Sequence, residues 1–136
     1  LGEVGRIASG GEKSRIYLGL SVLQRRDKQK PLQLFDEIDA GLGMDNAVPV
    51  AELLGRLAVD GQVICITHLP TVAARGDNHL KVEKMVTGGR TVLQVVPIPG
   101  EARVVEIARL LGGEKSGIKG GSDKQAAYAR QLLGQG

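Results

Sequence analysis

Aromatic side chains are scarce in this chain. Its 136 residues include one phenylalanine, two tyrosines and no tryptophan. Proteins that bind unpaired nucleic-acid strands usually stack bases on aromatic rings, so a dedicated single-strand binding face is not expected. The net charge of +3 at pH 7 permits contact with nucleic acid without requiring it, because the basic residues are spread along the chain. Because aromatic residues are so few, the hydrophobic core must be mainly aliphatic.

Cysteine and long apolar runs are also scarce. The single cysteine, Cys65, excludes a disulfide within the chain and suits a reducing compartment. The chain contains no run of 18 or more apolar residues, so no membrane-spanning helix is predicted. The chain shows no N-terminal signal pattern and begins at Leu1, so we expect it to be cut from a longer protein. Its length suits one domain.

The first half of the chain is expected to form a parallel βαβ unit. Two apolar strands are separated by a helix of suitable length, and parallel strands need such a crossover. The unbroken run Val63-Ile64-Cys65-Ile66 suggests a strand buried on both faces. The expected elements are a helix from Ser9 to about Arg26 with an apolar stripe of Ile16, Leu20 and Leu23, a strand at 32–35, a glycine-rich loop at 39–45, a helix to about Ala58 and a strand at 62–67.

The second half is expected to begin with a hairpin and to end with helices. Residues 80–87 and 91–98 are β-rich and flank Gly88-Gly89, which predicts an antiparallel hairpin at one edge of the sheet. The remaining elements are a helix at 101–111 with Val104, Ile107, Ala108 and Leu111 on one face, a glycine-rich linker at 112–121, and a last helix from a capping box of Ser122 and Gln125 to about Leu133.

A Ser-Gly-Gly turn opens the first predicted helix. Ser9 and Glu12 have the spacing of a capping box. The backbone N–H groups of Gly10 and Gly11 and the helix dipole favour an anion such as a phosphate at the same place. A plain N-cap explains the serine equally well, and both roles are compatible.

Two adjacent carboxylates, Asp36 and Glu37, follow the first apolar strand. Ligands of open α/β sheets bind beyond the carboxyl ends of the strands. Phosphoryl transfer needs one carboxylate to hold Mg²⁺ and a second group to orient or deprotonate the attacking water. Adjacent residues at a strand end can supply both, although two solvated turn carboxylates remain the alternative.

His68 follows the second predicted strand. If the two strands are neighbours, His68 is expected to lie beside Glu37, where it could donate to a γ-phosphate. The alternative is a strand-end histidine that caps the turn at Pro70. No stretch matches GxxxxGK[ST], and residues 112–116 (GGEKS) lack its spacing and a preceding strand, so they are expected to be linker.

The motifs together resemble the C-terminal head segment of the RecN family of bacterial DNA repair proteins, which are SMC-like ABC ATPases. The resemblance runs from about Val4 to Leu133. The segments that carry it are ASGGE at 8–12 with Ser14-Arg15, FDEIDAG at 35–41, THLP at 67–70 with VAA at 72–74, and ARLLGG at 108–113. It implies the C-terminal lobe of an ABC-type P-loop ATPase head, with parallel strands, flanking helices and an antiparallel edge hairpin over residues 1–136.

The resemblance also implies roles for individual residues. Asp36 would hold Mg²⁺ through water, Glu37 would position the lytic water, and His68 would sense the γ-phosphate of ATP on its own head. Asp39 would lie at the head–head interface. The motif that would contact ATP on the opposite head is Ser9, Gly10, Gly11 and Glu12.

The implied whole protein is a bacterial, cytoplasmic, nucleoid-associated ATPase. Two heads would close around two ATP molecules, and this closure would be tied to holding DNA during double-strand break repair. The phosphate-binding loop and the coiled coil lie N-terminal to this segment in such families, so the segment alone is expected to be inactive. The alternatives are another SMC-like ATPase, since Lys13 is common in that branch, a transporter-type ABC ATPase, or a non-catalytic module for dimerisation or DNA binding.

Overall fold

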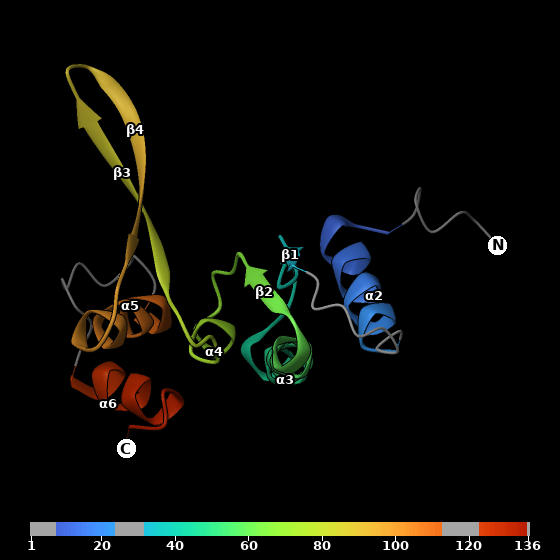
Figure 1. Ribbon diagram of the computed structural model, residues 1–136. Coiled ribbons are helices and arrows are strands. Elements are labelled where there is room, and N and C mark those ends of the chain that lie inside the picture. The colour runs from blue at the N-terminus through green and yellow to red at the C-terminus, as the bar shows by residue number, and fades with distance from the viewer. Residues whose placement is uncertain (1–7, 24–31, 113–122, 136) are drawn as a thin grey trace. The chain divides into compact units, whose positions relative to one another are not determined.

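The computed structural model describes residues 8–23, 32–112 and 123–135. The chain divides into two compact units, residues 1–75 and 76–136, where its length alone suggested one domain. Both units are drawn in Figure 1. The expected start of the last helix at Ser122 and most of the expected linker lie outside the described residues. Within those residues, no helix is long and apolar enough to cross a membrane.

The first unit contains the predicted βαβ motif. Strands β1 (Leu32–Phe35) and β2 (Gln62–Cys65) pair in parallel, with Phe35 opposite Cys65. Helix α3 (Met44–Asp60) makes the crossover. This crossover brings the residues that follow the two strands to the same edge of the sheet, which is the placement that the sequence pattern required.

The core of the first unit lies between the sheet and α3. The apolar side chains of α3 recur at helical spacing, so one face of the helix enters the core. Leu18 of helix α2 (Gly10–Leu23) and Phe35 of β1 meet this face, with 1 % and 2 % of their surfaces exposed. The buried α3 residues are Ala47, Val50, Ala51, Leu54 and Leu57. The core is aliphatic apart from the Phe35 ring, as predicted.

Two apolar surfaces of the first unit are uncovered. The outer face of the parallel sheet exposes Leu32, Leu34, Ile64 and Ile66 by 43–62 %. The prediction that the second strand is buried on both faces was therefore wrong: only its α3-facing side is covered. The predicted stripe of Ile16, Leu20 and Leu23 on α2 is exposed as well, and Leu18 enters the core instead.

The second unit is a hairpin with two helices. Strands β3 (Leu80–Thr87) and β4 (Arg90–Pro97) pair antiparallel over eight residues. They form a two-stranded sheet of their own, so the expected place at the edge of the parallel sheet is not observed among the described residues. Helices α5 (Glu101–Gly112) and α6 (Asp123–Leu132) pack together, and the hairpin projects away from them in Figure 1.

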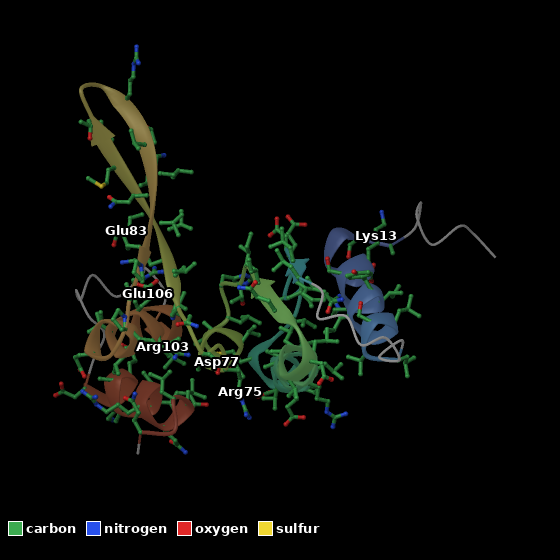
Figure 2. All side chains as sticks on the ribbon, viewed as in Figure 1. Lys13, Arg75, Asp77, Glu83, Arg103 and Glu106 are labelled. Atoms are coloured by element: carbon green, nitrogen blue, oxygen red, sulfur yellow. The ribbon has the colours of Figure 1, made fainter. Side chains whose placement is uncertain are left out.

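Ion pairs join the parts of the second unit. Glu106 of α5 is 6 % exposed. Arg109 donates to both of its carboxylate oxygens, from Nη2 to Oε1 at 2.6 Å and from Nε to Oε2 at 3.1 Å, and Nζ of Lys81 in β3 lies 3.3 Å from Oε2. Figure 2 shows Glu106 near the base of the hairpin. Burial opposes ionisation of Glu106, but Arg109 and Lys81 lower the pKa of its carboxyl overall. Arg130 of α6 pairs with Glu101 of α5 at 2.6 Å.

The packing of α5 gives the first prediction. Ile107 is fully buried, whereas Val105 on the same helix is 45 % exposed. Ile107→Ala should lower the free energy of unfolding by about 2–5 kcal/mol, because it removes apolar contacts and leaves a cavity. Val105→Ala, the matched control, should change it by less than about 1 kcal/mol. Urea unfolding of the two variants checks this, and equal losses would contradict the described orientation of α5.

Candidate functional site

The Ser-Gly-Gly turn forms the predicted capping box. The N–H of Glu12 donates to Ser9 Oγ at 3.3 Å, and the N–H of Ser9 donates to Glu12 Oε2 at 2.7 Å. These bonds to Ser9 lower the pKa of the Glu12 carboxyl. The turn therefore begins α2 at Gly10 with both capping partners on the exposed side of the helix.

The same turn packs directly on the loop that follows β1. A Cβ atom at Gly11 would lie 2.9 Å from the carbonyl oxygen of Glu37 and 3.0 Å from Cβ of Ala40. A Cβ atom at Gly10 would lie 2.6 Å from Glu37 Oε2. Glycine is thus needed at position 11, where a side chain would meet the backbone of the loop, and the Glu37 carboxylate lies at the N-terminal end of α2.

Two further side chains of α2 hold this loop. Ser14 Oγ donates to the carbonyl of Asp36 at 2.9 Å. Arg15 Nη1 donates to the carbonyls of Ile38 and Ala40 at 3.1 and 3.0 Å. The sequence analysis gave neither residue a role. The available signal was their spacing, since Arg15 lies one helical turn after Gly11 and therefore on the same face of α2.

Asp36 and Glu37 follow β1 as predicted. Asp36 is exposed at the carboxyl end of the strand. Glu37 has φ +56°, and no other described residue except glycines has a positive φ. Such a backbone is sparsely populated by residues with a side chain and is often found at functional sites. The strained turn directs the Glu37 carboxylate toward Gly10.

His68 contacts Asp39, and its expected place beside Glu37 stays a prediction. Its Nδ1 is 3.2 Å from Oδ2 of Asp39, and 70 % of the His68 side chain is exposed. The alternative that His68 caps the turn at Pro70 is not observed. Helix α4 (Pro70–Ala73) has Leu69 at its N-cap and no side-chain capping bond.

Asp39 is buried in its own unit, with 2 % of its surface exposed. Its Oδ2 accepts hydrogen bonds from the hydroxyl of Thr67 and from the N–H groups of His68 at 2.9 Å and Leu69 at 3.3 Å. Burial opposes ionisation of Asp39, but these bonds and the neighbouring His68 lower the pKa of its carboxyl overall. Its expected position at a head–head interface stays a prediction.

The carboxyl end of β1 is suited to a cation that is coordinated by the protein and by a bound ligand together. The described residues contain no group of three or more histidine, cysteine, aspartate or glutamate side chains that could hold a metal. Mg²⁺ in nucleotide sites, however, takes only one or two carboxylates and completes its shell with water and phosphate oxygens. The exposed carboxylate of Asp36 fits that requirement, so the residues present fit magnesium bound together with a nucleotide.

The chain has curated relatives in one family. It is 45 % identical over 133 residues to the DNA repair protein RecN of Deinococcus radiodurans, 43 % over 126 residues to that of Streptomyces coelicolor and 35 % over 135 residues to that of Bacillus subtilis. These matches cover 98 %, 93 % and 99 % of this chain. The chain belongs to the RecN family. It spans 21–23 % of the length of these relatives.

A solved structure has a similar fold. With a TM-score of 0.56 and 29 % identity, it covers 82 % of this chain and 66 % of its own. It is described as structural biochemistry of ATP-driven dimerisation and DNA-stimulated activation of SMC ATPases. No protein-family profile matches the chain. The α/β fold of an SMC-like ATPase head segment is therefore confirmed, as the motifs implied.

Cys65 gives a prediction about this edge of the sheet. Burial, together with the carboxylates of Asp39 and Asp36, disfavours a thiolate and raises the pKa of its thiol to about 12. The folded chain should therefore react slowly with iodoacetamide at pH 9, where an unperturbed thiol is half ionised, and alkylation should accelerate only as the pH approaches 12. The urea-unfolded chain is the control, and an equal rate in the folded chain at pH 9 would contradict the described burial.

The same shift has a consequence for stability. The folded state keeps the Cys65 proton to a higher pH than the unfolded state, whose thiol ionises near pH 9. The contribution to stability is thus complete below pH 9 and is lost as the pH rises toward 12.

Proposed function

We propose that this chain is the C-terminal segment of an ATPase head in a DNA repair protein that acts on double-strand breaks in the bacterial cytoplasm, in association with the nucleoid. One observation carries the proposal: within one unit, Ser14 and Arg15 of the helix that the capping turn opens are hydrogen-bonded to the loop at 36–40, and Asp39 of that loop is hydrogen-bonded to the turn at 67–69. The family's DNA repair name and the SMC ATPase likeness support it.

In the proposed reaction, water attacks the γ-phosphorus of ATP and the bond to the bridging oxygen breaks, giving ADP and phosphate. Glu37 orients the water and accepts its proton, and His68 contacts the γ-phosphate. Asp36 would hold Mg²⁺, which supplies positive charge to the phosphate oxygens. Ser9, Gly10, Gly11 and Glu12 would meet the ATP of a second head, because the capping turn presents N–H groups of a helix N-terminus.

The uncovered apolar surface of the first unit supports a partner within the same head. Parallel sheets are normally covered on both faces, yet Leu34 and Ile66 are 61 % and 55 % exposed. The relatives are more than four times the length of this chain. We therefore assign the outer face of β1 and β2 to an N-terminal lobe that also carries the phosphate-binding loop.

The test of the reaction is ATP turnover by the chain mixed with its N-terminal segment. Turnover should appear only on mixing, and Glu37→Gln should lower kcat by about 100-fold or more while ATP binding is kept, because the water loses its base. Asp77→Gln is the control, because Asp77 is an exposed residue of the second unit. Full turnover by Glu37→Gln would reject the catalytic role, and no turnover by a folded and associated pair would favour a binding module.

The test of the lobe interface uses the same two pieces. Leu34→Gln should weaken their association by about tenfold or more, because a polar side chain would replace a leucine that is buried in the interface. Val59→Gln is the matched control, since Val59 is 72 % exposed on α3 outside this face. Isothermal titration measures both, and equal affinities for the two variants would exclude the outer sheet face as the interface.

A further inference from the structure

One oxygen of Asp39 holds three consecutive residues after β2. Oδ2 accepts from the Thr67 hydroxyl and from the N–H groups of His68 and Leu69. The Thr67 hydroxyl oxygen also accepts from the Leu69 N–H at 3.1 Å. A buried carboxylate is stable only when such donors satisfy it, so these bonds fix the turn and the carboxylate together.

The same oxygen also sets the orientation of the His68 ring. Oδ2 lies 3.2 Å from Nδ1, which places the proton of a neutral imidazole on Nδ1. The ring is otherwise 70 % exposed. With Nδ1 engaged by Asp39, Nε2 is the nitrogen that remains for a ligand. The buried Asp39 side chain therefore fixes the orientation of the exposed His68 ring.

The position of Asp39 is itself fixed from α2. Arg15 donates to the carbonyls of Ile38 and Ala40, the residues on either side of Asp39. Arg15 lies one turn after the start of the helix that opens with the Ser-Gly-Gly turn. The contacts thus run without a gap from α2 through Asp39 to His68.

We propose that Asp39 is a positioning residue that acts on ATP hydrolysis through His68, not a residue that contacts nucleotide or a second head. A side chain with 2 % exposure has almost no surface to offer another molecule. The proposal rests on the proposed function, because it takes His68 as the group that meets the γ-phosphate. It assigns to Asp39 a different role from the interface contact that the family resemblance implies.

The first experiment measures kcat and KM for ATP with the complete protein. Asp39→Asn keeps the shape of the side chain and removes its charge. We expect kcat to fall by about 10- to 100-fold, because a displaced His68 is aligned poorly with the phosphate, and KM to change little. Asp77→Asn is the matched control for the loss of one aspartate charge. A loss confined to KM would contradict the proposal.

The second experiment is a double-mutant cycle with His68→Gln. If Asp39 acts through His68, adding Asp39→Asn to His68→Gln should lower kcat by less than about threefold further, so that the effects are strongly non-additive. If the two substitutions lower kcat independently, so that their fold-losses multiply in the double variant, the proposal is overturned. It is also overturned if Asp39→Asn abolishes ATP-dependent dimerisation in the His68→Gln background, because that loss indicates a direct role at the interface.

A third measurement separates this proposal from the proposed function. In the chain with ¹⁵N-labelled histidine, the Nδ1 resonance of His68 reports whether that nitrogen carries a proton, and His68→Gln assigns it against His79. We expect the Nδ1-protonated form in the unchanged chain and a shift toward the Nε2-protonated form in Asp39→Asn. Equal tautomer ratios would refute the positioning of His68 by Asp39. The expected shift, together with no ATP turnover by the complete protein, would keep that positioning and reject the proposed function.

Discussion

The site depends on one buried carboxylate. The four-residue strands β1 and β2 pair over a short register, and little else in the backbone joins the segments that follow them. Asp39 bridges these segments: its main chain belongs to the loop after β1, and its side chain binds the turn after β2. A backbone bond from the Ile66 N–H to the Phe35 carbonyl at 2.9 Å extends the strand pairing to the same place. Without the carboxylate, the Thr67 hydroxyl and the His68 N–H would lose this acceptor, and the Leu69 N–H would keep only its bond to the Thr67 hydroxyl oxygen.

The first unit combines a well-packed core with surfaces that a complete domain would cover. Helix α3 covers one face of the sheet, while the other face and the stripe on α2 remain apolar and exposed. Apolar surface of this kind usually marks contact with another part of the protein. The arrangement accords with the share of the RecN relatives that the chain spans. The candidate site is built within this unit, and the proposed N-terminal lobe would cover the apolar surfaces around it.

The local features of the site could be predicted from the sequence. The Ser9–Glu12 box depends on residues three apart, and the βαβ order follows from two apolar runs and one helical period. The burial of Asp39 could not be predicted, because it depends on which residue of β1 lies opposite Cys65. The exposure of Ile16 and Leu20 could not be predicted either, since an apolar stripe indicates a face but not whether another element covers it.

The backbone of Glu37 has a consequence for any attempt to stabilise this protein. Glycine and asparagine adopt φ near +56° at lower cost than glutamate, so either residue at position 37 would relieve strain. A screen that selects for thermal stability would therefore tend to replace this side chain and would remove the carboxylate at the end of β1. Thermal stability and turnover are expected to be opposed at this position, and a sequence chosen for folding alone would not retain the glutamate.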